Sequence, residues 1–351
     1  MPGPSVFLRD FWYLALTGAE LPAGRFVRRK ILGEPLLIGR ARDGAVFAWR
    51  DICPHRGMPL SYGTFDGCEV SCSYHGWRFG PDGQCTAIPS LAAGQTGINL
   101  DRIRVQSFPC RESQGLVWVF VPERTDPAHA AELPPVPLMP GPGDASPRVA
   151  ISMPFPCGAD HAAYGLMDPT HAAFVHTSWW WKKNAGRLRE KTKHFEPAPL
   201  GWRMARHRLP GEHRLYRLLG REVTTEITYS LPGLRIEHIE GDRHSAVGLT
   251  AITPVTETET IVHQCMFWTP GWLGPLKPVA RHLMRMFLGQ DRDVVAKQQE
   301  GLAYGPNLML IDDADTQARW YTQVKREFLR ARDEGRPFAN PVKARTLRWR
   351  S

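Results

Sequence analysis

Two short cysteine–histidine pairs constrain what this chain can fold into more than any other feature of its 351 residues. The pairs are Cys53-Pro54-His55 and Cys72-Ser73-Tyr74-His75, and each follows a segment of strand-like composition. Thiolate and imidazole are the side chains that bind borderline and soft metal ions in proteins. Each loop presents one thiolate and one imidazole. The two loops therefore predict a metal site on a scaffold of β-strands.

The donor set alone leaves two metal centres open. One is zinc bound by two cysteines and two histidines, and the other is an iron–sulfur cluster with the cysteines on one iron and the histidines on the other. The C-x-H spacing favours the cluster, because common zinc sites are built from C-x2-C pairs. Gly57 and Gly76, close behind the two histidines, also let backbone amides approach bridging sulfides.

The two loops resemble those of the Rieske [2Fe–2S] domain, with the sequences Cys53-Pro54-His55-Arg56-Gly57 and Cys72-Ser73-Tyr74-His75-Gly76-Trp77. The resemblance implies that Cys53 and Cys72 hold one iron, and that His55 and His75 hold the outer one. A stand-alone Rieske ferredoxin needs only about 100 residues, so most of this chain must serve another purpose.

Composition divides the chain into two parts. Residues 10–120 alternate turn sequences with strand-like segments at 27–38, 46–49, 76–79 and 116–121. The stretch 122–147 is rich in proline and cannot sustain a helix or a central strand. We therefore expect an all-β domain over residues 1–135, a junction at about 122–147, and a second domain over residues 148–351.

The second domain is expected to have an α+β fold. Residues 160–176 have helical character, and four strand-like segments follow at 222–230, 234–240, 246–254 and 258–268. Two more helices are expected near 278–302 and 314–334. A run of antiparallel strands closed by a long helix predicts a helix-grip-like domain with a cavity between the sheet and the helices.

Asp168, His171 and His176 lie in the first of these helical segments. The histidines are five residues apart, so on a regular helix their side chains diverge by roughly 140°. They converge on one ion only if the helix bends, bulges or ends between them. The spacing alone is therefore weak evidence for a second metal site. Asp168 lies one turn before His171 and can accept the far N–H of its ring.

The pattern D-x2-H-x4-H downstream of the Rieske motif resembles the catalytic half of the Rieske non-haem iron oxygenases. The phrases Phe11-Trp12-Tyr13 and Gly33-Glu34-Pro35-Leu36 fit the branch that uses α subunits only, as vanillate O-demethylase does. The resemblance implies a mononuclear Fe(II) held by His171, His176 and one carboxylate, with other positions open for O2 and substrate.

The resemblance also implies how the two metal centres are completed and connected. The carboxylate is expected from residues 290–299, with Asp291 as the chosen ligand and Asp293 as the alternative. Asp168 is expected to bridge His171 to the cluster histidine of a neighbouring subunit, which corresponds to His75 in this sequence. Such a bridge requires a head-to-tail homotrimer.

The function expected from these features is that of a terminal oxygenase component. Electrons come from NAD(P)H through a separate reductase, with or without a ferredoxin, because the chain has no G-x-G-x-x-G nucleotide-binding fingerprint. O2 is the co-substrate, and hydroxylation or oxidative demethylation is favoured over cis-dihydroxylation of an aromatic ring. The alternative of another class is a Rieske electron-transfer protein with a non-catalytic binding domain.

Aromatic residues in the second half have two interpretations. Trp179, Trp180, Phe267 and Trp268 either fill the core or line a pocket for a hydrophobic aromatic or polycyclic substrate, sterol-like substrates included. Few charged residues flank the metal-binding histidines in the sequence, which indicates a substrate that is not strongly anionic.

The net charge of +9 raises the question of nucleic acid. Basic residues cluster at 25–30, 182–193 and 343–350, but no nucleic-acid-binding motif accompanies them. Solvated faces, or a docking face for an acidic electron donor, are the favoured interpretations. No apolar run approaches the roughly 18–20 residues of a membrane span, and the N-terminus shows no signal peptide. We expect a cytoplasmic protein without a membrane span.

Overall fold

A computed structural model describes residues 7–92, 95, 97–123, 133–141, 143–176, 188–209 and 216–351. The chain divides into two compact units, of which one covers Arg9–Leu138 and the other contains Met139–Ser351. The division falls inside the proline-rich stretch of the sequence.

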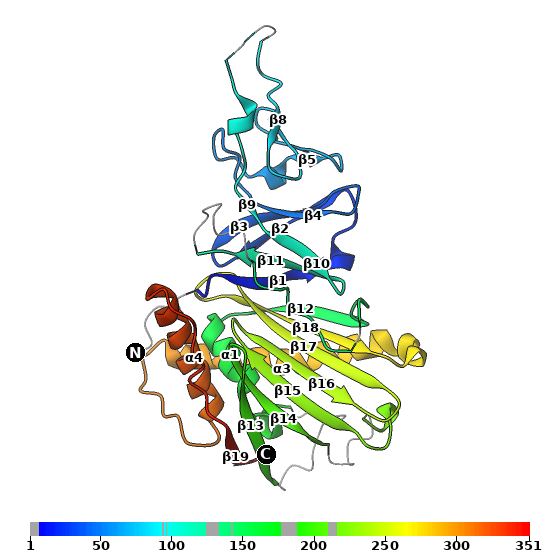
Figure 1. Ribbon diagram of the computed structural model, residues 1–351, viewed down its shortest axis with the longest axis vertical. Coiled ribbons are helices and arrows are strands. Elements are labelled where there is room, and N and C mark those ends of the chain that lie inside the picture. The colour runs from blue at the N-terminus through cyan, green and yellow to red at the C-terminus, as the bar shows by residue number, and fades with distance from the viewer. Residues whose placement is uncertain are drawn as a thin grey trace. The chain divides into compact units, whose positions relative to one another are not determined.

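The first unit is built on sheets that are all antiparallel, and short 3-10 helices lie between some of their strands. Its strands are β1 (Phe11–Thr17), β2 (Arg25–Ile31), β3 (Glu34–Arg40), β4 (Val46–Arg50), β5 (Thr64–Phe65), β6 (Val70–Ser71), β7 (Arg78–Phe79), β8 (Cys85–Ala87), β9 (Ser107–Phe108), β10 (Cys110–Ser113) and β11 (Leu116–Val121). They form three sheets with the orders β1-β11-β10, β2-β3-β4-β9 and β5-β6-β7-β8 (Figure 1).

Turn chemistry and burial explain these strands. The strand predicted over residues 27–38 is in fact the hairpin β2–β3, because the chain turns at Leu32 and Gly33, whose φ angles are 52° and 79°. Strand β11 lies in the middle of its sheet and is buried along its whole length. A core cluster that includes Leu37, Trp49 and Phe79 also encloses the two cysteines of the sequence motif.

The second unit is built on one antiparallel sheet of eight strands. They are β12 (Val149–Phe155), β13 (Glu190–Ala198), β14 (Gly201–Arg208), β15 (Thr224–Ser230), β16 (Leu234–Glu240), β17 (Ser245–Pro254), β18 (Thr260–Trp268) and β19 (Arg345–Arg350). Their order is β12-β18-β17-β16-β15-β14-β13-β19 (Figure 1). The four strands expected from the sequence correspond to β15–β18, whereas β12, β13, β14 and β19 extend the sheet beyond that expectation.

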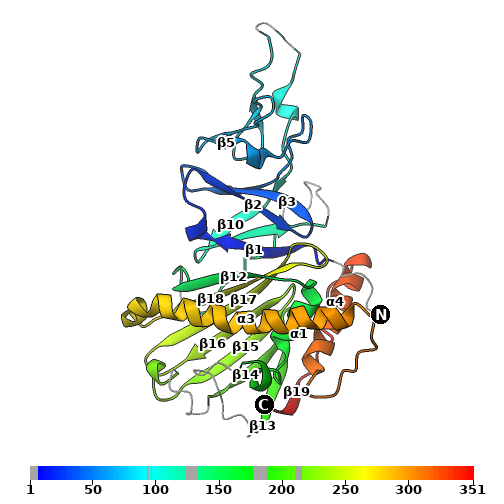
Figure 2. The same cartoon turned by 180° about the vertical axis from the view of Figure 1, so that it is seen from behind.

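Helices cover one face of this sheet. They are α1 (Ala159–Met167), α2 (Ala172–Val175), α3 (Lys277–Leu302) and α4 (Thr316–Asp333). Figure 2 shows α3 crossing the sheet, and α1 contacts α3, α4, β17 and β18. Trp202 Nε1 on β14 donates to Gln317 Oε1 on α4 at 3.0 Å, which identifies the side of the strands that faces the helices. We call this side the helix-covered face.

The helix predicted over residues 160–176 is interrupted. Helix α1 ends at Met167 and α2 begins only at Ala172, because Pro169 lacks an amide hydrogen and disfavours helical backbone at Asp168. The predicted α+β class, with an all-β first unit and an antiparallel sheet with helices in the second, is confirmed. Among the described residues, no helix is long and apolar enough to cross a membrane.

Candidate metal centres

The two cysteine–histidine loops share one backbone pattern. In both, the amide of the cysteine donates to the carbonyl of the residue five positions on, and the glycine four positions on donates back to the cysteine carbonyl. The bonds are Cys53 N to Met58 O (2.8 Å), Gly57 N to Cys53 O (2.9 Å), Cys72 N to Trp77 O (2.8 Å) and Gly76 N to Cys72 O (3.0 Å). Gly57 and Gly76 have φ angles of 73° and 71°, which favour glycine. The loops are therefore equivalent turns.

The loops bring the four predicted cluster ligands together. Cys53 and Cys72 are buried, whereas His55 and His75 are half-buried and their rings lie 4.5 Å apart. Trp77 stacks on His55, with an interplanar angle of 6°. Burial raises the pKa of the Cys53 thiol to about 11, and the neighbouring Cys72 acts in the same direction. Such a thiol ionises only beside a positive charge, which a bound metal supplies, so this donor set fits the cluster.

A buried carboxylate closes the first loop. The two oxygens of Asp51 accept hydrogen bonds from the amide and the hydroxyl of Ser61, at 2.7 and 2.6 Å. Arg28 lies 3.3 Å from the same carboxylate. Because Asp51 precedes the loop and Ser61 follows it, these bonds hold its two ends together. Sequence reasoning missed Asp51, although its position two residues before Cys53 is a usable signal.

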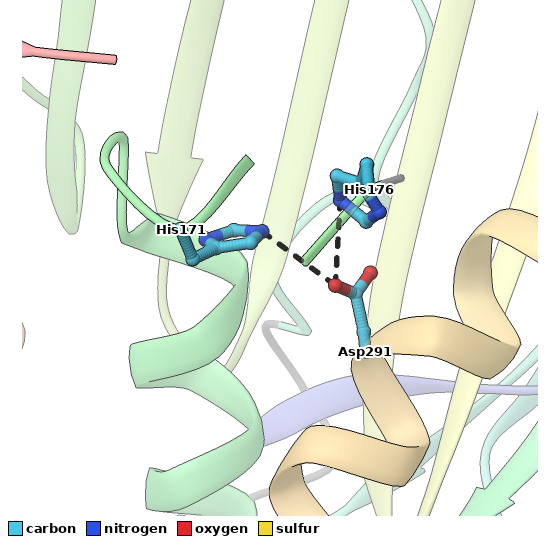
Figure 3. Close-up of side chains that lie close together, drawn as sticks. All are labelled: His171, His176 and Asp291. Atoms are coloured by element: carbon cyan, nitrogen blue, oxygen red, sulfur yellow. Dashed lines mark ion pairs between the residues drawn. The ribbon is translucent and has the colours of Figure 1, made fainter. Parts of the chain in front are cut away.

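The second centre depends on the break between α1 and α2. Asp168 ends α1 with extended backbone, and its Oδ1 accepts hydrogen bonds from the amide and the hydroxyl of Thr170, at 2.7 and 2.6 Å. His171 immediately precedes α2, and His176 immediately follows it. The break removes the divergence that a continuous helix imposes, and both rings point towards Asp291 on α3 (Figure 3).

Asp291 meets both histidines. Its Oδ1 lies 3.5 Å from His171 Nε2 and 3.4 Å from His176 Nε2 (Figure 3). The three donor atoms lie within 4.8 Å of one another. Two imidazoles and one carboxylate in this arrangement match the facial triad of non-haem Fe(II) sites. The side chain of Asp293, the alternative ligand, is 58% exposed and pairs with Arg292, so the structure brings Asp291 to the histidines instead.

Neighbouring groups orient both imidazoles. His176 Nδ1 lies 3.2 Å from Gln290 Oε1, and its ring stacks on Phe287 at 3.6 Å. His171 Nδ1 lies 3.6 Å from Asp168 Oδ2. The acceptor beside Nδ1 of His176 favours the tautomer that leaves Nε2 free for a metal, and the carboxylate of Asp168 favours the same tautomer of His171 through its charge. Sequence reasoning missed both Gln290 and Phe287. Gln290 could have been found, because it is adjacent to the predicted ligand Asp291. Nothing in the sequence distinguishes Phe287 from a core phenylalanine.

Burial shifts the titration of the triad. It raises the pKa of Asp291 to about 6, although the charges of His171 and Arg235 oppose the rise. It lowers the pKa of His176 to about 4. Burial also lowers the pKa of His171, but Asp168 and Asp291 outweigh it and the net shift is upward. An ionised carboxylate is therefore costly in the metal-free site, and a bound cation offsets that cost, so the donor set fits Fe(II).

The predicted pocket residues do not form one group. Trp179 and Trp180 lie outside the described residues. Phe267 and Trp268 are neighbours on β18, so their side chains point to opposite faces of the sheet. Phe267 shares its face with its cross-strand partner Val247, away from the helices, and so does not point towards the triad.

The helix-covered face carries a charged pair, Arg235 and Glu237 on β16, whose side chains are 2.9 Å apart. This corrects the expectation of few charged residues near the histidines, because the charge of Arg235 acts on Asp291. In the sequence, Arg235-Ile236-Glu237 has the alternation typical of an exposed strand. Only the register of the sheet shows that the side chains of Arg235 and Glu237 point towards the helices.

Both halves of the chain match known protein families. Residues 11–109 match the Rieske [2Fe-2S] domain, and residues 162–327 match the vanillate O-demethylase oxygenase C-terminal domain. The first match includes all four residues of the cysteine–histidine loops. The second includes His171, His176 and Asp291.

Individual relatives carry oxygenase names. Chlorophyllide a oxygenase of Arabidopsis thaliana is 30% identical over 51% of this chain and 31% of its own length. The 4beta-methylsterol monooxygenase of Methylococcus capsulatus is 36% identical over 38% of this chain and 35% of its own length. The chain therefore covers about a third of the length of these relatives.

Solved structures share the fold over nearly the whole chain. Dicamba monooxygenase bound to dicamba has a TM-score of 0.71 and 24% identity, over 94% of this chain and 99% of that one. The Pseudomonas putida NdmA QL mutant with caffeine has a TM-score of 0.70 and 22% identity, over 93% of this chain and 92% of that one. At this level of identity the likeness concerns the fold.

Proposed function

This chain belongs to the Rieske oxygenases, and on that premise we propose that it is the terminal oxygenase component of a multi-component system. A separate NAD(P)H-dependent reductase, with or without a ferredoxin, supplies electrons, and O2 oxidises a hydrophobic small molecule. The observation that carries the proposal is the convergence of His171, His176 and Asp291 in a chain that also holds a Rieske domain.

The proposal assigns the first centre to electron entry. Cys53 and Cys72 bind one iron of the cluster, and His55 and His75 bind the other. When bound, the cluster supplies single electrons and the mononuclear iron activates O2. Because the histidines are half-buried and the cysteines buried, an electron donor reaches the cluster from the histidine side.

The second centre is assigned to oxidation. His171 and His176 bind the mononuclear iron through Nε2, and Asp291 binds it through Oδ1. Gln290 holds the ring of His176 in place. Asp168 does the same for His171 and is itself partly exposed, with a side chain that is 32% accessible.

That exposure supports a second role for Asp168 as an electron-transfer bridge. A carboxylate at the surface can accept a hydrogen bond from His75 of the partner subunit while its other oxygen faces His171. The proposal therefore includes a homotrimer in which each cluster serves the iron of a neighbour. It also places the protein in the cytoplasm.

The reaction we favour is hydroxylation or oxidative demethylation of an aromatic or polycyclic substrate, sterol-like substrates included. The similarity to a methylsterol monooxygenase supports a reaction of this kind. Ring cis-dihydroxylation is the alternative. Trp179 and Trp180 follow the iron-binding histidines directly and remain the predicted aromatic wall of the pocket.

Iron content and single-turnover chemistry test the proposal together. We expect about three irons per chain, two in the cluster and one at the triad. His171→Ala should lose one iron, keep the visible spectrum of the cluster, and form no product when the reduced protein meets O2 and candidate substrates. His194→Ala, which removes a histidine on β13, is the matched control and should behave like the wild type.

The outcomes separate the competing functions. If His171→Ala retains all its iron and still forms product, the triad assignment is wrong. A Rieske electron-transfer protein with a non-catalytic binding domain would hold only the two cluster irons and would form no product from any candidate substrate.

A further inference from the structure

Arg235 and Glu237 lie two residues apart on β16, so their side chains point to the same face of the sheet. Arg235 Nη2 donates to Glu237 Oε2 at 2.9 Å. The register pairs Arg235 with Tyr229, whose ring stacks on Trp202. Because Trp202 bonds a residue of α4, this row of side chains lies on the helix-covered face.

The same face is turned towards the second metal centre. Asp291 belongs to α3, which crosses the helix-covered face (Figure 2). The positive charge of Arg235 lowers the pKa of Asp291 against the effect of burial. The guanidinium is therefore within electrostatic reach of the Asp291 carboxylate, and both groups lie on the helix-covered side of the sheet.

The pair remains accessible although its neighbours are not. The side chains of Arg235 and Glu237 are each 22% exposed, whereas Tyr229 and Thr250 beside them are 4% exposed. Gly248, the cross-strand partner of Glu237, has no side chain, and the sulfur of Met266 lies 3.3 Å from where its Cβ would be, so a thioether borders the pair on this side. The partial exposure of both charged side chains leaves them within reach of a small molecule held between the sheet and the helices.

The pair offers hydrogen bonds without surplus charge. A guanidinium has five N–H donors, and Glu237 engages only one terminal nitrogen of Arg235. Within the pair, Glu237 balances Arg235, while Asp168 and Asp291 balance a bound Fe(II). Lys193 on β13 shares this face, because Phe195 two residues on packs against Trp320 of α4, and burial lowers the pKa of its ammonium group. A carboxylate beside the pair would therefore find Arg235 already paired and would face the negative charge of Glu237.

We propose that Arg235 and Glu237 form a specificity-determining pair that holds an uncharged polar group of an otherwise apolar substrate. Such a group accepts a hydrogen bond from Arg235 and donates one to Glu237, as a primary amide or a hydroxyl does. A carboxylate only accepts, so Glu237 repels it. The inference rests on the proposed function and narrows its substrate class to neutral hydrophobic molecules that carry an amide or hydroxyl group.

Two ligands of nearly the same shape, 2-naphthamide and 2-naphthoate, test the pair. Their binding to the holoenzyme is measured by calorimetry at neutral pH without an electron donor, so that no turnover occurs. The wild type should bind the amide at least about tenfold more tightly, a difference of about 1.4 kcal/mol. Glu237→Gln removes the repelling charge but keeps the shape, and should prefer the carboxylate by about tenfold.

Two further variants complete the comparison. Glu240→Gln removes the same charge from the exposed end of β16 and should keep the wild-type preference. Removal of one partner of a buried pair can impair folding. The double variant Arg235→Gln/Glu237→Gln, which leaves the net charge unchanged, should therefore be measured as well, and it should bind both ligands at least about tenfold more weakly, with no preference.

Three results would overturn the proposal: a wild type that prefers the carboxylate, a wild type that binds neither ligand, or a Glu237→Gln variant with the wild-type preference. Calorimetric binding does not depend on turnover, so its failure leaves the iron-content test of the oxygenase function intact. Conversely, a chain without mononuclear iron fails that test whatever it binds.

Discussion

At the scale of single residues, Asp291 shows how burial prepares a carboxylate for a metal. Its oxygen lies between two imidazole nitrogens, and its pKa is raised to about 6 because the protein withholds water from the charged form. Asp293, two residues on, is solvated and paired with Arg292. The helix thus directs one carboxylate to the two histidines and the other to the surface.

Alanine at these two positions should therefore have opposite consequences. Asp291→Ala is expected to remove the mononuclear iron and lower turnover at least about 100-fold, because the triad loses its only charged ligand. Asp293→Ala should retain the mononuclear iron and the turnover of the wild type. Iron content, the cluster spectrum and single-turnover product yield measure the difference. Equal iron loss in the two variants would contradict the assignment of Asp291.

The raised pKa of Asp291 also predicts a pH-dependent stability of the metal-free protein. A carboxyl whose folded pKa is about 6 and whose ordinary value is 3.8 stabilises the folded state in its protonated form. That contribution is complete below about pH 4, and it is lost as the pH rises through about 6.

Asp291→Asn removes this dependence. At about pH 8 the metal-free variant should unfold with a free energy on the order of 2 kcal/mol higher than the wild type, and the difference should shrink towards pH 4. Urea denaturation at the two pH values measures it. If the free energy of unfolding rises by the same amount at both pH values, Asp291 has an ordinary pKa in the folded protein.

The residues that the sequence revealed are those whose partners lie close along the chain. The predicted cluster ligands and their glycines occupy two short turns, so a local motif records them. Arg235 and Glu237 depend on the register of a sheet and on Asp291, a residue more than fifty positions later, which no local pattern records. Phe287 is hidden for the same reason.

At the scale of elements, the hairpin of β13 and β14 requires a glycine at position 201. A methyl group on Gly201 would lie 2.0 Å from the carbonyl oxygen of Tyr229 on β15, and backbone cannot yield as a side chain can. Asn340 also donates to the Gly201 carbonyl at 2.8 Å. The close approach therefore joins three segments of the second unit.

Gly201→Ala should lower the free energy of unfolding by about 3 kcal/mol, because the overlap must be relieved by a shift of β14 or β15. Gly271→Ala is the control, since nothing lies within 4 Å of the added methyl group, and it should change stability by less than about 0.5 kcal/mol. Thermal unfolding of both variants gives the comparison. Similar stabilities would mean that the strands adjust freely at this point.

Elements were predictable where their hydrophobic pattern was strong. Strands β15–β18 and helices α3 and α4 follow the expected segments closely. Strands β13 and β19 lie next to each other at one end of the sheet, and their alternating charged and exposed residues conceal them in the sequence. The sequence did not predict where the helix after residue 160 breaks; it indicated only that His171 and His176 need such a break to converge on one ion. The structure shows the break at Asp168-Pro169.

At the scale of the whole molecule, the proposed electron route needs two subunits for one reaction. The cysteine–histidine loops and the triad belong to separate compact units of the chain, and in the proposed route Asp168 joins the triad of one subunit to the loops of another. Under that proposal, a chain that lacks either centre is inactive alone but can still complete the site of a neighbour.

Mixed oligomers test this arrangement. Cys72→Ser should lack the cluster and His171→Ala the mononuclear iron, and each variant alone should be inactive. When both are expressed together, about a quarter of neighbouring pairs combine an intact cluster with an intact iron, so about a quarter of wild-type activity should return. Activity indistinguishable from zero in a mixture with proven oligomers would place the electron route within one chain.

The edge strand β19 sets an order of events during synthesis. Its residue Trp349 pairs with Lys191 on β13, so the residues of β19 must leave the ribosome before this side of the sheet can close. The strands of the first unit all lie within residues 11–121 and can assemble long before. In the interval β13 presents a bare edge to other chains in the cell. Abundant chaperones during synthesis should therefore raise the yield of folded protein.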